Sequence, residues 1–182
     1  ARENLSTVEL SINKHVVNGK LTTARRKLHK KLARKITDGG QVARAGEQEF
    51  LTTGGYPGSG KSSILNRAFP NWQKKYVHID SDYIKTLLAA EDGIEKLGWR
   101  AYMYHDEADF VISEIFKLAQ RENRHILFDA TMKNPRKITG LISQYKEFGY
   151  KVTTAFADLP LEQSMERAIA RFFGKSGRFV DP

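Results

Sequence analysis

The sequence predicts an α/β protein in which helices cover both faces of a parallel sheet, in three layers. The run Gly55-Tyr56-Pro57-Gly58-Ser59-Gly60-Lys61-Ser62 is a complete phosphate-binding loop. Short β-rich runs then alternate with helical patterns, which favours parallel strands joined by helical crossovers. The chain has 182 residues, of which 40% are hydrophobic and 28% charged, enough for one α/β core and short for two.

The first predicted helix lies in the region of Lys20 to Lys35, where the basic residues concentrate, and it precedes the phosphate-binding loop. Thr22 or Thr23 can cap its start, and Gly39-Gly40 can end it. The residues of its apolar face recur near helical spacing: Leu21, Leu28, Leu32 and Ile36. We therefore expect this helix to bury one face against the rest of the chain.

Four strands and five further helices are expected in the remaining chain. The predicted strands are Glu49–Thr53, Tyr76–Ile79, His125–Phe128 and Lys151–Ala157. The predicted helices are Lys61–Ala68, Ser81–Ala90, Asp106–Arg121, Pro135–Phe148 and Leu161–Phe173. The fourth of these helices has clear boundaries, because Asn134 can cap it, Pro135 suits its first position and Gly149 follows its end. We expect residues 47–182 to form one phosphate-loop (P-loop) NTPase or kinase core, with residues 1–46 as a basic helical extension.

The net charge of +9 comes almost entirely from that extension. Residues 1–46 contain 11 Lys and Arg against 3 Asp and Glu, whereas the rest of the chain contains 19 against 18. Such a segment can attract nucleic acid, an anionic surface or an acidic protein partner. It is also typical of a solvated helix face, and we favour that interpretation.

Composition excludes several classes of protein. The absence of Cys excludes disulfides and cysteine zinc sites, and it fits the reducing cytoplasm. No apolar run approaches the roughly 20 residues of a membrane-spanning helix. We therefore expect a cytoplasmic protein with no membrane partner.

The phosphate-binding loop predicts ATP and Mg²⁺ as ligands. It follows a strand-like run at residues 50–53 and precedes a helix-like run, so its backbone N–H groups and the helix N-terminus can surround one anion. Lys61 is expected to reach the β- and γ-phosphates, and the Ser62 hydroxyl to ligate Mg²⁺. We expect residues 55–62 and Ser63 to form the nucleotide site.

Acidic residues follow the second predicted strand, at the sheet edge where ligands of parallel sheets bind. The run is Ile79-Asp80-Ser81-Asp82. Asp82 is expected to act as the general base that deprotonates an attacking hydroxyl. Asp80 suits either substrate contact or the capping of the following helix.

The third predicted strand ends in Asp129, the usual form of a second carboxylate facing Mg²⁺ beside a phosphate-binding loop. Thr131 and Lys133 extend from the same edge toward the expected position of an acceptor. Lys133 is also compatible with a merely solvated side chain.

Two arginines, Arg171 and Arg178, are separated by glycines near the end of the sequence. They favour a lid that brings positive charge onto the transferred phosphoryl group, although a surface charge cluster would look similar. Residues 98–107 mix aromatic and charged side chains. This suits either a pocket for a polar ring, with His105 and Glu107 as acceptor contacts, or a packed turn.

Five of these segments occur in the order and rough spacing of the zeta toxin family, which the chain resembles over about residues 22–182. They are Gly55–Ser62, Ile79–Asp82, His105–Ala108, Asp129–Asn134 and Arg171–Arg178. The resemblance implies ATP-dependent phosphorylation of a UDP-activated N-acetyl amino sugar, and a protein antitoxin as partner. The residues matched to these roles are Lys61 and Ser62 for ATP and Mg²⁺, Asp82 for the sugar hydroxyl, Thr131 and Lys133 for the acceptor, and Arg171 and Arg178 for phosphate.

The chain departs from the family at two points. Well-known members have Glu-Gly-Thr-Gly-Arg where this chain has Asp-Ala-Thr-Met-Lys at residues 129–133, so the acceptor stays open. The family also leads us to expect a fifth core strand and further helices after the lid, so we expect either a trimmed or a minimal version of the core.

Two other hypotheses stay open. A nucleic-acid or nucleoside kinase would use the basic N-terminus and bind oligonucleotides in a salt-dependent way. A nucleotide-dependent binding or assembly module would bind ATP without phosphorylating an acceptor, with residues 1–46 as its docking arm. We rank the module last, because a passive binder needs neither a candidate base nor two lid arginines.

Overall fold

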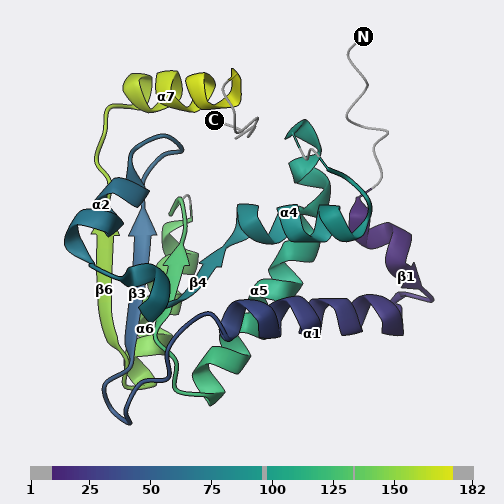
Figure 1. Ribbon diagram of the computed structural model, residues 1–182, viewed down its shortest axis with the longest axis horizontal. Helices are drawn as coiled ribbons and strands as arrows, with labels where there is room; N and C mark the ends of the chain where they lie inside the picture. The colour runs from purple at the N-terminus through teal and green to yellow at the C-terminus, as the bar shows by residue number, and fades with distance from the viewer. Residues whose placement is uncertain (1–9, 96–97, 133, 174–182) are drawn as a thin grey trace.

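The computed structural model describes residues 10–95, 98–132 and 134–173 (Figure 1). Its main sheet is parallel throughout, with the strand order β4-β5-β3-β6. The strands are β3 (Glu49–Gly54), β4 (Val77–Asp80), β5 (Ile126–Asp129) and β6 (Lys151–Phe156). The parallel sheet is confirmed, and each strand boundary lies within one residue of the predicted one.

The predicted helices are all present. They are α1 (Thr23–Thr37), α2 (Lys61–Ala68), α4 (Ser81–Glu91), α5 (His105–Arg121), α6 (Pro135–Glu147) and α7 (Leu161–Phe173). The structure adds short elements that the sequence patterns did not predict: η2 (Ser11–His15), the hairpin β1 (Val16–Val17) and β2 (Lys20–Leu21), α3 (Trp72–Lys75) and η3 (Gly98–Tyr104). No described helix combines the length and the apolar character that a membrane span requires.

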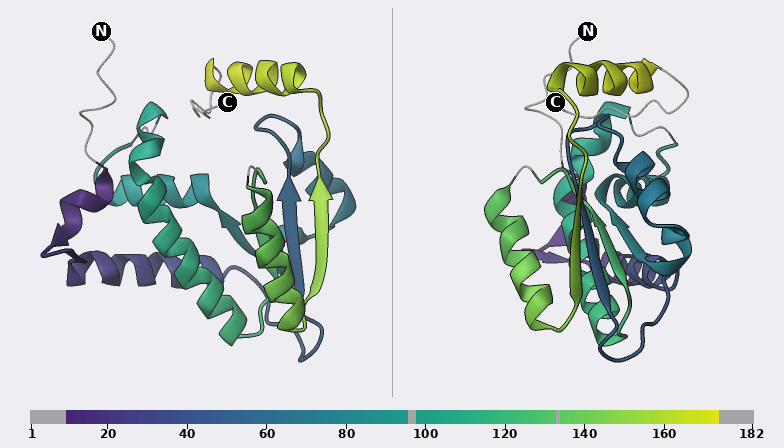
Figure 2. Two further views of the ribbon diagram at one scale, coloured as in Figure 1. Left: turned by 180° about the vertical axis from the view of Figure 1, so that it is seen from behind. Right: turned by 90° about the vertical axis from the view of Figure 1, so that its left-hand side faces the viewer.

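The sheet is covered on both faces, as Figure 2 shows in its edge-on view. On β3, Leu51 packs with Leu65 of α2 on one face, together with residues around α3. On the other face Phe50 stacks on Tyr145 of α6, with ring centroids 4.3 Å apart, and contacts Phe116 of α5. Because neighbouring strand residues point to opposite faces, the two apolar clusters form the inner boundaries of a three-layer α/β/α fold.

Helix α1 belongs to the main core although it precedes the sheet in sequence. Leu32, Ala33 and Ile36 are buried with residues of α5 and β4. Thr22 caps the helix, since its hydroxyl accepts a hydrogen bond from the Arg25 N–H at 3.3 Å. Figure 1 shows α1, α4 and α5 extending beyond the β4 edge of the sheet. The basic extension is thus packed on the core over this helix, while the boundary at residue 46 stays a prediction.

Candidate functional site

The segment between β3 and α2 is a glycine-rich turn at the carboxyl edge of the sheet. Gly55, Gly58 and Gly60 have φ values of 126°, 86° and 92°, a range that glycine enters without steric cost. Gly60 forms the N-cap of α2, and Lys61 is its first residue. The turn therefore ends at a helix N-terminus, where free backbone N–H groups and the helix dipole favour an anion.

Lys61 folds back over this turn. Its ammonium group donates to the carbonyl oxygens of Gly55 at 3.2 Å and Tyr56 at 3.5 Å. Ser62 and Ser63 follow in the first turn of α2 and are exposed. The loop thus carries an ammonium group, two hydroxyls and a helix N-terminus, the groups that a triphosphate with a divalent cation requires.

Ser59 supplies a test of whether phosphate fits this turn. Its side-chain oxygen is buried, and no described group hydrogen-bonds to it. An unpaired buried hydroxyl is costly, and a phosphate oxygen in the turn would be a suitable partner for it. The residues present therefore fit a bound nucleotide tail.

Next to the turn, the ends of β4 and β5 bring two carboxylates together. Asp80 and Asp129 are direct neighbours in the strand register, and Thr53 of β3 is the neighbour of Asp129 on its other side. The Thr53 hydroxyl donates to Asp129 Oδ1 at 2.6 Å. His78, Asp80 and Asp129 each offer a ligand atom, and these atoms lie within 4.8 Å of one another. Oxygen-rich groups of this kind suit a divalent cation.

Asp80 and Asp82 are close in sequence but differ in what they contact. Asp80 Oδ1 accepts hydrogen bonds from the backbone N–H groups of Asp82 at 2.9 Å and Tyr83 at 3.3 Å, so Asp80 caps α4. Asp82 lies in the first turn of α4, with its side chain 43% exposed, and forms an ion pair with Lys85 at 3.3 Å. The capping interpretation of Asp80 is therefore correct, while Asp82 keeps an accessible carboxylate.

The segment after β5 passes over the end of β3. Met132 has a φ of 59°, and a Cβ added to Gly54 would lie only 2.4 Å from its sulfur atom. Thr131 is exposed beside it. Lys133, also predicted to contact the acceptor, lies outside the described residues.

Helix α7 packs on the glycine-rich turn and lies above the carboxyl ends of the strands in Figure 1. A Cβ added to Gly58 would be 2.3 Å from the Ser164 carbonyl oxygen and 3.3 Å from Cβ of Arg167. The side chain of Arg167 therefore starts beside the loop. The sequence analysis did not identify Arg167 as a site residue. Arg171 follows one helical turn later, and this spacing of four residues was a signal that could have found Arg167. Arg178 lies outside the described residues.

Of the two predicted acceptor contacts on α5, only His105 is exposed. Glu107 is fully buried, and its carboxylate accepts hydrogen bonds from Ser11, Arg25 and His29. Burial raises the pKa of Glu107, but the hydrogen bonds from His29, Arg25 and Ser11 outweigh it and hold the pKa at about 2. Glu107 is therefore an ionised residue of the protein interior. This agrees with the packed turn rather than with the predicted acceptor contact, and Glu107 is not part of the acceptor site.

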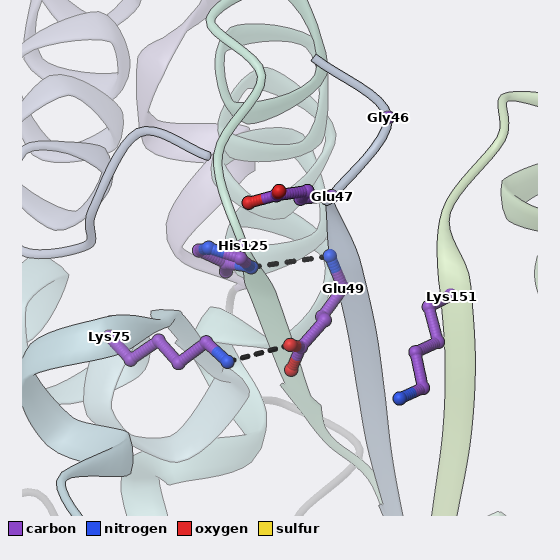
Figure 3. Close-up of a pocket in the computed structure, with 6 residues that line it drawn as sticks. All are labelled: Gly46, Glu47, Glu49, Lys75, His125 and Lys151. Atoms are coloured by element: carbon purple, nitrogen blue, oxygen red, sulfur yellow. Dashed lines mark hydrogen bonds and ion pairs between the residues drawn. The ribbon is translucent and has the colours of Figure 1, made fainter. Parts of the chain in front are cut away.

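A pocket of about 450 Å³ lies at the opposite, amino end of the sheet (Figure 3). The residues that line it are Gly46, Glu47, Glu49, Lys75, His125 and Lys151. Within it Lys75 pairs with Glu49 at 2.7 Å, and Nδ1 of His125 accepts the Glu49 N–H at 3.2 Å. None of the predicted site residues lines this pocket, so it is separate from the glycine-rich turn.

Known proteins resemble this chain in sequence pattern and in fold. Residues 34–182 match the family model described as Zeta toxin. The fold resembles a chain from the PezAT toxin–antitoxin system of Streptococcus pneumoniae, with a TM-score of 0.66 and 20% identity, over 84% of this chain and 64% of that one. It also resembles AvrRxo1-ORF1:AvrRxo1-ORF2 with ATP, with a TM-score of 0.70 and 21% identity, over 84% of this chain and 51% of that one.

No curated protein matches the chain in sequence. The chain covers less than two thirds of the length of each of these two solved structures. At about 20% identity the similarity concerns the fold, and it confirms the predicted three-layer P-loop kinase-like class.

Proposed function

This chain belongs to the zeta toxin family, and on that basis we propose that it is an ATP-dependent kinase. Its acceptor is a hydroxyl of a nucleotide sugar such as UDP-N-acetylglucosamine. The observation that supports this most strongly is the position of the glycine-rich turn beside two carboxylate-bearing strand ends, with Asp80 and Asp129 adjacent in register. A phosphate site next to a candidate base and a cation site is the arrangement that phosphoryl transfer needs.

The nucleotide would be held by residues 55–63. Backbone N–H groups of the turn and the Lys61 ammonium group would bind the phosphates, and the buried Ser59 hydroxyl would gain a partner. Ser62 and Asp129 would hold Mg²⁺, which supplies charge neutralisation at the phosphates. His78 and Asp80 stand close enough to Asp129 to complete that site.

Asp82 would accept the proton of the acceptor hydroxyl. The hydroxyl oxygen then bonds to the γ-phosphorus of ATP, while the bond between the γ-phosphorus and the bridging β-phosphate oxygen breaks and ADP leaves. Its exposed carboxylate at the start of α4 supports this role. Arg167, Arg171 and Arg178 would supply positive charge to the transferred group. Thr131, Lys133 and His105 remain proposed acceptor contacts.

We also propose a protein antitoxin as partner and the cytoplasm as the place of action. The partner is proposed by analogy with the PezAT toxin–antitoxin system, because one solved chain from that system has a similar fold. ATP and activated sugars are cytoplasmic metabolites, and a chain without Cys fits a reducing compartment.

Substitution of the proposed base tests the function. We expect Asp82→Asn to leave ATP binding nearly unchanged and to slow phosphorylation by at least about a hundredfold, the lower end for a positioned general base. The measurement is transfer from labelled ATP to nucleotide sugars in a metabolite extract, with the product identified by mass. Lys61→Ala should instead weaken ATP binding in a calorimetric titration.

Glu114→Gln is the matched control for the base. Glu114 is also an acidic helix residue paired with a lysine three positions later, Lys117 at 2.8 Å, and it lies in the middle of α5. We expect Glu114→Gln to leave the rate of phosphoryl transfer unchanged. Wild-type transfer rates in Asp82→Asn would remove Asp82 from its role, and labelled oligonucleotide ends without a labelled sugar would favour the nucleic-acid kinase.

A further inference from the structure

A buried polar cluster connects the N-terminal part of the chain to both ends of the segment that joins α4 to α5. Its centre is Arg25 of α1, whose side chain is only 5% exposed. Nη1 and Nη2 of Arg25 donate to the two oxygens of Asp92, at 2.6 and 3.1 Å. Nε and Nη2 also donate to Glu107, the second at 3.1 Å. One guanidinium group thus bridges the end of α4 and the first turn of α5.

Further donors orient the same two carboxylates. His29 Nε2 lies 2.6 Å from Glu107 Oε1, and the Ser11 hydroxyl donates to Glu107 Oε2 at 2.6 Å. The Tyr104 hydroxyl donates to Asp92 Oδ2 at 2.9 Å. With Glu107 fully buried, the carboxylate has little freedom to move. A planar guanidinium group between two carboxylates fixes their separation and relative orientation, which a lysine ammonium group does not.

The bridged segment, residues 93–104, contains η3 and leads into the exposed His105. Figure 1 shows that the N-terminal end of α5, which follows this segment, lies on the side of the molecule to which the strands point and on which α7 lies. The segment begins at the C-terminal end of α4, and Asp82 lies in the first turn of the same helix, at its other end. Its exposed polar residues include Arg100, and His105 and Asp106 follow at the start of α5. Holding the two ends of this segment therefore sets the position of the polar residues at the start of α5, which include the proposed acceptor contact His105.

The same helix provides an internal comparison. At the other end of α1, Arg34 forms a bidentate pair with Glu122 at 2.7 and 3.0 Å. Glu122 follows the C-terminus of α5, so this pair fastens α1 to α5 without touching residues 92–107. If α1 only needed attachment to the core, the Arg34 pair and the buried apolar face would provide it.

We propose that Arg25 is a positioning residue for the acceptor, acting through Asp92 and Glu107 on the segment between α4 and α5. The proposal rests on the kinase function proposed above, and it assigns a role to the N-terminal helix in acceptor recognition. The proposed nucleotide site is the glycine-rich turn after β3, which contributes no residue to this cluster. We therefore expect nucleotide binding to be independent of Arg25.

Lysine substitution at the two arginines of α1 tests the role. We expect Arg25→Lys to raise the KM for the sugar acceptor at least about tenfold, since displacement of a positioned group by about 1 Å can cost up to about a hundredfold. The KM for ATP should stay within about twofold. Arg34→Lys should leave both KM values unchanged, although both variants lower thermal stability. Tyr104→Phe, which removes a single hydroxyl, should change the acceptor KM in the same direction by a smaller factor.

Amide hydrogen exchange gives a readout that needs no acceptor. Arg25→Lys and Tyr104→Phe should speed exchange in residues 93–106, whereas Arg34→Lys should not. An unchanged acceptor KM in Arg25→Lys, equal losses for ATP and acceptor, or equal effects of Arg34→Lys would each overturn the positioning role. If wild-type protein phosphorylates no acceptor, the proposed function fails. In that case, unchanged exchange in residues 93–106 of Arg25→Lys would independently exclude the proposed positioning role of Arg25.

Discussion

Glu107 illustrates how this fold keeps a carboxylate ionised in its interior. Desolvation alone would raise its pKa, but hydrogen bonds from His29, Arg25 and Ser11 lower it from 4.5 to about 2. The folded state therefore binds a proton at Glu107 less readily than the unfolded chain does. This contribution to stability is complete above about pH 4.5 and is lost as the pH falls toward 2.

Glu107→Gln tests that linkage. We expect it to lower the free energy of unfolding at pH 7 by on the order of 3 kcal/mol, at about 1.4 kcal/mol for each pKa unit. The difference from wild type should shrink between about pH 5 and pH 2, because wild-type protein loses the same contribution there. Urea denaturation across this range measures it.

The difference curve is the quantity to follow, because Glu122 also has a pKa of about 2 and titrates in the same window. Hydrogen bonds from Arg34, and to a smaller extent from Arg124, lower the pKa of Glu122. Neither arginine is among the groups that lower the pKa of Glu107. A difference that stays constant from pH 7 to pH 2 would contradict the linkage.

At the scale of elements, α7 depends on a glycine in the loop beneath it. Gly58 has a φ of 86°, and any Cβ there would meet the Ser164 carbonyl oxygen at 2.3 Å. Backbone atoms cannot rotate out of the way as a side chain can, so a larger residue would lift α7 from the loop. The contact couples α7 to the glycine-rich turn.

We expect Gly58→Ala to destabilise the protein by on the order of 2–5 kcal/mol, from φ strain of about 1–2 kcal/mol and overpacking of about 1–3 kcal/mol. Gly149→Ala is the control, because Gly149 has a similar φ of 81° and open space at its Cβ position. Chemical denaturation measures the cost of each. Hydrogen exchange in residues 161–173 should increase only in Gly58→Ala, and equal behaviour of the two variants would exclude the contact with α7.

At the scale of the whole molecule, the glycine-rich turn lies where β3, α2 and α7 meet, so a bound nucleotide should stabilise the entire fold. We expect MgATP at a hundred times its Kd to add about 2.7 kcal/mol to the free energy of unfolding. A thermal melt with and without nucleotide measures this. The Lys61→Ala variant at the same MgATP concentration should gain clearly less, and an equal gain would place the nucleotide elsewhere.

Much of the fold could be predicted because the signals are local. Short β-rich runs between helical patterns located all four strands of the main sheet, and Asn134 with Pro135 marked the start of α6, where Asn134 Oδ1 accepts the Lys137 N–H at 3.1 Å. The hairpin of β1 and β2 was missed although Asn18-Gly19, a turn signal, lies between its strands with both φ values positive. Two-residue strands are too short for an alternation pattern to stand out.

The sequence by itself determined the glycine-rich loop, the order of the four main strands and the six longer helices, and the carboxylates at the strand ends, because spacing along the chain defines each of them. Tertiary structure alone decided that Glu107 is buried rather than presented to a substrate, that Arg167 lies beside Gly58, and that Arg25 bridges Asp92 and Glu107. These contacts join residues far apart in sequence, and only the packing of the folded chain brings them together.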